Sequence, residues 1–259
     1  MICKDVMEKL NQRWSPSFAM DWDNVGLLVG REEKEIQKIF VALDVTEDNL
    51  NQAFAFGADL MITHHPLLFS PVKKINTGDF IGRRLIQMIQ KDLCYFAMHT
   101  NFDVKGMAQL NENCLRLKNT SVLEVTAMEE QEEGIGRIGF LEKEMELEEF
   151  AKNVKAGMQI PDVRVYGDLK GKISKVAVSS GSGKSMVKEA LKKQADVLVT
   201  GDIDYHTGID AVAQGMAIID AGHYGTEYCF IEYMTQELGQ MFPEMRVQGA
   251  VINHPYQVF

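Results

Sequence analysis

The sequence predicts an α/β protein of two pseudo-repeated halves, each a mixed sheet flanked by helices. Two observations predict this class. Short apolar strands alternate with helical segments along the 259 residues, as in βαβ units. The segment GADLMIT at 57–63 also matches QADVLVT at 194–200. Because only two copies are present, we interpret the match as an internal duplication rather than a solenoid.

The first half, residues 1–125, is predicted to begin with an amphipathic helix and continue as βαβ units. Thr46 is the expected N-cap of its second helix, and Gly57 is the expected stop. The expected elements are a helix over 3–14, a strand ending at 30, a strand over 39–43, a helix over 46–56, a strand over 60–63, a helix over 80–91 and a strand over 95–98.

The second half, residues 126–259, is predicted to repeat this plan after a small α+β insert. The acidic run at 129–133 is interpreted as a solvated linker. The insert is expected to contain a strand over 137–141, a helix over 146–155 and a strand over 163–166. The repeat is expected to contain strands over 176–178, 197–200 and 217–219, and helices over 184–193, 208–214 and 226–240.

The composition narrows the class of protein. The 27 Lys and Arg against 37 Asp and Glu give a net charge of -10, so nucleic acid is not a favoured partner. The four cysteines are scattered without a CxxC pair, which indicates reduced thiols and disfavours cysteine ligands. No apolar stretch reaches membrane-spanning length and the N-terminus lacks a signal-peptide block, so we expect a cytoplasmic protein without a membrane partner.

Residues that bind metals follow several of the predicted strands. His64 and His65 end one strand, Asp103 follows the next, and His223 with Glu227 follow a strand of the second half. The carboxyl ends of parallel strands form one rim, where ligands collect. Adjacent histidines on a strand diverge, which suits two metals better than one. Imidazoles and carboxylates without thiolate suit zinc, manganese or iron(II), and paired ions of this kind activate water.

Each of these residues alone has a simpler interpretation. A histidine at a strand end is commonly a hydrogen-bonded structural residue. Asp103 could cap a helix, and Glu227 could be a first-turn carboxylate favoured by the helix dipole. Their joint occurrence at strand ends favours metal binding.

Five motifs in the same order resemble the family of GTP cyclohydrolase 1 type 2 homologues, also called NGG-interacting-factor-three-like proteins. The resemblance spans almost the whole chain and indicates the short form, with only a compact insert. The motifs are WDNVGL at 22–27, THHP at 63–66, HTNFD at 99–103, TGD with YH at 200–206, and AGHYGTE at 221–227.

The resemblance implies two divalent metal ions per chain, zinc, iron or manganese, held by His64, His65, Asp103, His223 and Glu227. It also implies a toroidal homohexamer, and it places His99 and His206 near the metals, where we take them as catalytic candidates for proton transfer. Asp204 departs from the family pattern, in which a lysine often precedes the YH pair. That departure weakens any role for this position in phosphate binding.

Two functions remain open. The first is a metal-dependent hydrolase, GTP cyclohydrolase-like, acting on a nucleotide or related small molecule through metal-activated water. The second is a non-enzymatic, ring-shaped metal-binding scaffold or metal chaperone, which needs the same ligands. The loop SGSGKS at 180–185 is not a P-loop, because Val178 stands where that motif requires glycine. We interpret the loop as a glycine-rich wall beside the metal residues.

Overall fold

The computed structural model describes residues 1–258 and divides into two compact units. The first unit comprises Met1–Phe102 and Tyr228–Ile252, and the second comprises Asp103–Glu227 and the chain from Asn253 on. The units are therefore interleaved along the chain. The sequence predicts instead two consecutive halves with a boundary after residue 125, and that boundary stays a prediction.

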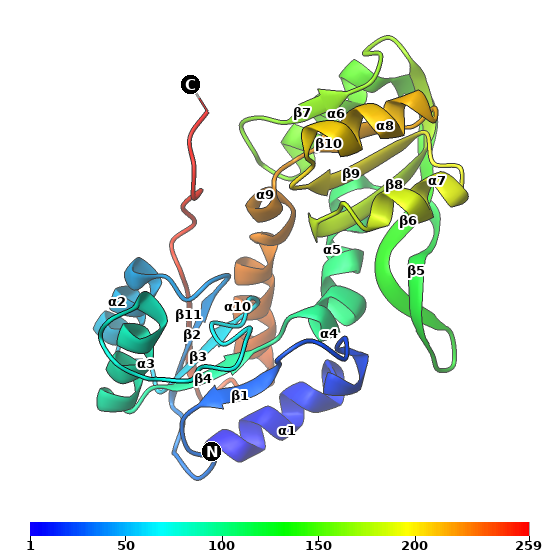
Figure 1. The fold of residues 1–259 in the computed structure, drawn as a ribbon. Coiled ribbons are helices and arrows are strands. Elements are labelled where there is room, and N and C mark those ends of the chain that lie inside the picture. The colour runs from blue at the N-terminus through cyan, green and yellow to red at the C-terminus, as the bar shows by residue number, and fades with distance from the viewer. Residues whose placement is uncertain (259) are drawn as a thin grey trace. The chain divides into compact units, whose positions relative to one another are not determined.

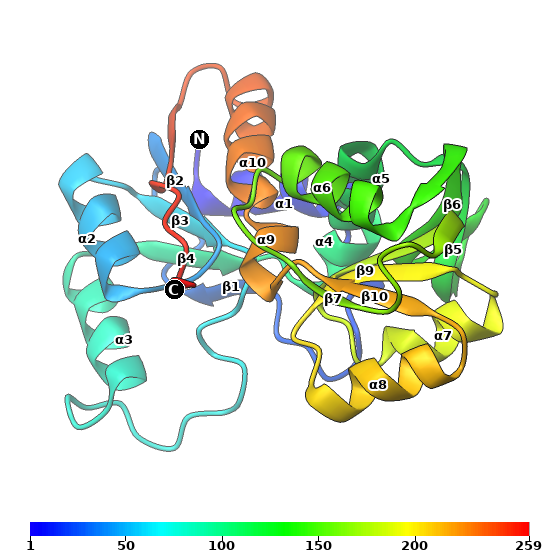
Figure 2. The same ribbon diagram turned by 90° about the horizontal axis from the view of Figure 1, so that it is seen from above.

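The first unit contains a five-stranded sheet in the order β1-β4-β3-β2-β11. β1 runs antiparallel to β4, and the other neighbouring pairs are parallel. Helices α2 and α3 cover one face and α1 and α10 the other (Figures 1 and 2). The elements are α1 Cys3–Arg13, η1 Pro16–Phe18, β1 Gly26–Val29, β2 Lys38–Ala42, α2 Glu47–Phe56, β3 Leu60–Thr63, α3 Phe80–Gln90, β4 Cys94–Ala97, α4 Thr100–Phe102, α10 Cys229–Met241 and β11 Arg246–Gly249.

The second unit contains a six-stranded sheet in the order β5-β6-β8-β9-β10-β7. β8, β9 and β10 are parallel, and β7 runs antiparallel to β10. Helices α7 and α8 cover one face and α5 and α6 the other (Figure 2). The elements are η2 Asp103–Met107, α5 Ala108–Leu115, β5 Lys118–Met128, β6 Glu132–Glu146, α6 Leu147–Gly157, β7 Arg164–Tyr166, β8 Lys172–Ser182, α7 Met186–Lys192, β9 Val197–Gly201, α8 Tyr205–Ala213, β10 Ala217–Asp220 and α9 His223–Glu227.

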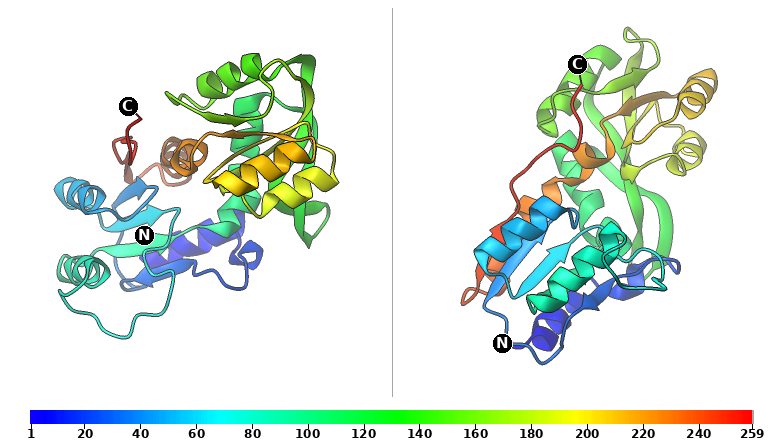
Figure 3. Two further views of the ribbon diagram at one scale, coloured as in Figure 1. Left: turned by 45° about the horizontal axis from the view of Figure 1, so that its top comes forward. Right: turned by 60° about the vertical axis from the view of Figure 1, so that its left-hand side comes forward.

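Both sheets contain a matching set of three parallel strands, β2-β3-β4 and β8-β9-β10, with an antiparallel strand beside the last at the sheet edge, which confirms the pseudo-repeat. In the first unit α2 and α3 lie side by side over the strands they connect (Figure 3), and α7 and α8 occupy the matching places in the second. The match extends to hydrogen bonds. Asp59 accepts two backbone N–H groups, from 37–38, at 2.9 and 3.0 Å, and Asp196 accepts two from 174–175 at 2.8 Å each.

Local sequence signals explain where several elements begin and end. Thr46 caps α2 by accepting the N–H of Asn49 at 3.1 Å, and Gly57 ends the helix with a φ of 72°. The strand predicted over 60–63 is β3, and all four of its residues are buried. Because β3 has parallel neighbours and helices on both faces, a continuous apolar run is what its environment requires.

The strands of the insert belong to the second sheet, because β6 pairs with β8 and β7 pairs with β10. Two expectations need correction. The acidic run is not a linker but the turn between β5 and β6, and its Glu133 is buried in an ion pair with Lys105 at 2.7 Å. The helix expected from Thr226 begins earlier, as α9, and α10 starts anew at Cys229.

Within residues 1–258, no helix is both long enough and apolar enough to cross a membrane.

Candidate metal centre

The first unit brings three histidines together. His64 and His65 follow β3, and His99 follows the neighbouring parallel strand β4. One ring nitrogen of each lies within 4.8 Å of the others. The ring centroids are 4.9 Å apart for His64 and His65, and 5.2 and 5.6 Å from these to His99. His64 is fully buried and packs on Phe102 and Phe230, so its ring has a fixed place.

Each of these rings is oriented through its Nδ1 atom. The acceptors are carbonyl or carboxylate oxygens, which cannot donate, so Nδ1 carries the hydrogen in each case. In the neutral ring Nε2 then presents its lone pair, as in metal-ligating histidines. The Nδ1 contacts are His64 to the carbonyl of Met98 at 2.9 Å, His65 to Asp44 at 2.8 Å and His99 to Asp23 at 2.8 Å.

Asp23 anchors His99 as a buried carboxylate. Its side chain is 0% exposed, and it also accepts the N–H and the hydroxyl of Thr100 at 2.9 and 2.5 Å. Burial by itself would raise the pKa of Asp23. The hydrogen bonds from His99 and Thr100 outweigh burial and lower this pKa to about 2. Asp23 therefore stays ionised at neutral pH and holds the imidazole of His99.

The second unit assembles the other three candidate ligands. His223 begins α9, and Glu227 follows one turn later, with 3.1 Å between His223 Nε2 and a carboxylate oxygen of Glu227. Asp202 accepts His223 Nδ1–H at 2.7 Å, so this ring is oriented like the others. Asp103, at the start of η2, has a carboxylate oxygen within 4.8 Å of one of Glu227 and accepts the hydroxyl of Ser180 at 3.3 Å.

Glycine is required where the end of β8 passes these ligands. A Cβ atom at Gly181 would lie 2.5 Å from Glu227 Oε1 and 3.3 Å from His223 Nε2, and the φ of Gly181 is 64°. The 180–185 loop also uses its amides internally. The N–H of Gly181 donates to Thr226 Oγ1 at 2.9 Å, and that of Gly183 donates to the carbonyl of Gly201 at 3.1 Å. These bonds favour a wall beside the ligands over a phosphate cradle.

His206 stands apart from these groups. It lies exposed in the first turn of α8 with its ring 5.2 Å from that of Tyr205. Among residues 1–258, it joins no cluster of three potential ligands. Asp204 caps α8 through the N–H of Thr207 at 3.0 Å and pairs with Lys184 at 2.8 Å, which lowers the pKa of Asp204. The catalytic role of His206 stays a prediction.

The carboxylates that orient the histidines are not among the residues predicted from the sequence. Asp44 lies two residues past β2, Asp202 directly follows β9, and Asp23 lies in the WDNVGL motif. Asp44 and Asp202 carry the same signal as His64 and His65, a polar residue just past a buried strand, whereas Asp23 precedes β1 and carries no such signal.

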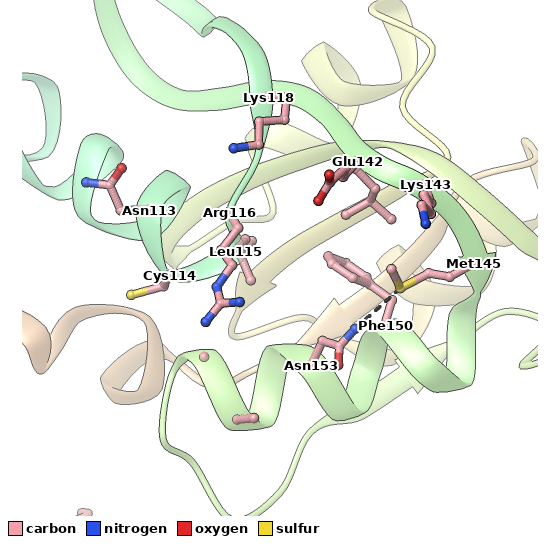
Figure 4. Close-up of a pocket in the computed structure, with 13 residues that line it drawn as sticks. Asn113, Cys114, Leu115, Arg116, Lys118, Glu142, Lys143, Met145, Phe150 and Asn153 are labelled. Atoms are coloured by element: carbon pink, nitrogen blue, oxygen red, sulfur yellow. Dashed lines mark hydrogen bonds between the residues drawn. The ribbon is translucent and has the colours of Figure 1, made fainter.

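Residues of the second unit line cavities of two different kinds. One of about 760 Å³, between α5, β6 and α6, is lined by residues such as Arg116, Glu142 and Phe150 and contains no candidate ligand (Figure 4). Another, of about 670 Å³, is lined by Asp202 and Gly222 and by residues of the C-terminal segment. Because Asp202 orients His223, the second cavity is the one associated with the candidate ligands.

The chain is similar in sequence and in structure to proteins of one family. The family model Duf34/NIF3 (NGG1p interacting factor 3) matches residues 1–256. A Clostridium acetobutylicum protein named GTP cyclohydrolase 1 type 2 homolog is 36% identical over 251 residues, covering 96% of this chain and 94% of that protein. A Staphylococcus aureus protein of known structure is 30% identical with a TM-score of 0.91, over 100% of this chain and 99% of the other. A Bacillus cereus protein related to NIF3 shares the fold, with a TM-score of 0.94, 24% identity and coverage of 100% and 99%.

Proposed function

The chain belongs to the Duf34/NIF3 family, and we propose that it is a cytoplasmic dinuclear metal protein that hydrolyses a nucleotide or related small molecule. The observation that carries the proposal is the shared orientation of four histidines. Each has its Nδ1 atom held by an oxygen acceptor, so Nε2 is the nitrogen that would bind a metal in His64, His65 and His223 or exchange a proton in His99. The name of the Clostridium acetobutylicum relative supports a hydrolase of the cyclohydrolase type.

The proposed ligands are His64, His65, Asp103, His223 and Glu227. Neutral imidazoles and carboxylates fit zinc, iron(II) or manganese, and the described residues near them include no thiolate. When bound, such a pair of ions supplies Lewis acidity that activates water against an electrophilic centre.

The remaining polar residues have roles of their own in this proposal. Asp44 and Asp202 keep the rings of His65 and His223 in the ligating tautomer. His99 Nε2 accepts a proton from the substrate side, and Asp23 stabilises the resulting imidazolium through Nδ1–H. His206 is the second candidate for proton transfer.

A ring-shaped metal-binding scaffold or metal chaperone is the alternative. The same four Nδ1 hydrogen bonds would orient histidines that hold a metal without catalysing a reaction. Turnover of a nucleotide by the metal-loaded protein would support the hydrolase. Metal transfer to an acceptor protein without turnover of any nucleotide tested would support the scaffold.

The protein is expected to hold about two ions per chain when loaded. Replacing Glu227 by glutamine should lower the metal content, because the amide is a weaker ligand of nearly the same shape. Elemental analysis after gel filtration measures both. At most one ion per chain, unchanged in Glu227→Gln, would contradict the dinuclear proposal.

The protein is also expected to form a homohexamer. Light scattering at micromolar concentration should give about six times the 29.2 kDa chain mass. A monomeric mass under the same conditions would remove the ring from the proposal and leave the metal ligands untouched.

A further inference from the structure

Two exposed aromatic rings stand beside the histidines of the first unit. Trp22 is 59% exposed and Phe69 is 55% exposed, and their ring centroids are 5.7 Å apart. Both rings also contact His99, at 6.0 and 6.4 Å between centroids. Covering large apolar rings that are exposed to water lowers the free energy, so this pair is a candidate binding surface.

Hydrogen bonds on both sides keep the pair in place. Asp23, next to Trp22, binds the ring of His99, and Asn24 Nδ2 donates to the carbonyl of Leu68 at 2.6 Å. Leu68 directly precedes Phe69. The consecutive residues 22–24 therefore supply the Trp22 ring and also bind its two neighbours, the ring of His99 and the backbone that precedes Phe69. A surface ordered in advance loses less conformational entropy when it binds.

We infer that Trp22 and Phe69 form a stacking platform for a planar heteroaromatic ring of the ligand that reaches the histidine cluster. The inference rests on the proposed function only in taking this ligand as the substrate. Every planar heteroaromatic ring offers a π-face, so such a platform selects the class without reading hydrogen-bonding groups. The observed rings are tilted by 50° at 5.7 Å, and a ring between them would need about 7 Å, two carbon contact distances. The ligand ring therefore lies on an outer face.

A small ligand fits this surface better than a protein partner does. The two rings together expose on the order of 200 Å², from typical aromatic side-chain areas. A stable protein interface buries about 800 Å² per partner. The immediate neighbours are also polar, since Asp21 is exposed and His99 is partly exposed. An aromatic pair bordered by charge and imidazole suits a ring that carries polar substituents.

The test measures binding of guanosine, nicotinamide and a pterin by calorimetry, with ribose 5-phosphate as the probe without a ring. Trp22→Ala is expected to weaken the best of the three by about 5- to 140-fold, the range expected for loss of one stacking ring. Phe69→Leu should weaken it less. Phe80→Leu is the matched control, because Phe80 is 52% exposed in the same unit but stacks on Arg84.

Tryptophan fluorescence gives an independent readout. Trp14 is 1% exposed and Trp22 is 59% exposed, so acrylamide quenching in the wild type reports mainly Trp22. The bound ring should protect Trp22 from acrylamide, and ribose 5-phosphate should not. All measurements are made with metal-loaded and with chelator-treated protein.

Equal affinity in Trp22→Ala and wild type, or no binding of any of the three rings, would overturn the inference. Protection that grows with protein concentration in the absence of ligand would also overturn it, because a second copy would then cover the rings. Ring binding that depends on Trp22, in a protein that takes up no metal under loading conditions, would support the platform and contradict the proposed function. Two bound ions per chain, without binding of any of the three rings, would support the metal centre of the proposed function and overturn the platform.

Discussion

Replacing His65 by alanine is expected to abolish most of the response of the protein's melting temperature to chelators. Metal binding stabilises the folded state by RT ln(1+[L]/Kd), about 3–4 kcal/mol at hundred- to thousand-fold saturation. For a chain of this size that corresponds to about 6–16 °C. The wild-type melting temperature should fall by this amount on chelation, and that of His65→Ala should barely move.

The apo fold of this variant is expected to persist. Leu60, Met61 and Ile62 are fully buried in β3 and supply its packing, while the side chain of His65 is 23% exposed. Far-ultraviolet circular dichroism of the chelated variant and chelated wild type should coincide. Equal chelator sensitivity in the two proteins would show that His65 is not a ligand.

Substituting Asp44, which orients His65, should weaken metal binding less than His65→Ala does. Asp44→Ala removes the Nδ1 acceptor but leaves the imidazole, so metal affinity should fall by about 10- to 100-fold rather than vanish. Asp48→Ala is the matched control, because Asp48 is exposed on α2 and contacts no histidine within the described residues.

The sequence predicted the parts of the fold whose signals are local. β3 starts with an apolar run, Leu60–Ile62, between Asp59 and Thr63, and α2 carries both a cap and a stop. β11 and β5 were missed. β11 is a four-residue strand with two exposed residues, and its place beside β2 depends on a pairing across some 200 residues. β5 is a sheet edge without clean alternation, since its burial changes irregularly from residue to residue.

Local signals also mark the candidate histidines. His64, His65 and His99 stand out because a strand directly precedes each motif, and the structure brings these three together. Their orientation was not predictable. Asp23 lies 76 residues before the ring it holds, and Asp202 lies 21 residues before His223. Which oxygen meets which Nδ1 atom depends on how the strands are ordered in the sheet, and sequence spacing alone does not give that order.

Replacing Gly181 by alanine is expected to displace a candidate ligand of the second unit directly. A left-handed backbone costs a residue with Cβ about 1–2 kcal/mol. The new methyl group would also fall 2.5 Å from Glu227 Oε1, so the buried carboxylate would have to move. We expect metal content to fall to about one ion per chain or less, together with a lower melting temperature of the apo protein.

Two other glycines separate the causes of this loss. Gly26 has a φ of 102° but nothing within 4 Å of an added Cβ, so Gly26→Ala carries backbone strain without a clash. Gly239, inside α10, has neither strain nor a nearby atom, so Gly239→Ala should stabilise the helix by up to about 1 kcal/mol. If Gly26→Ala lowers the melting temperature yet keeps its metal, while Gly181→Ala loses both, the metal loss comes from the displaced Glu227. Full metal content in Gly181→Ala would show instead that Glu227 is not needed as a ligand in the position the structure gives it.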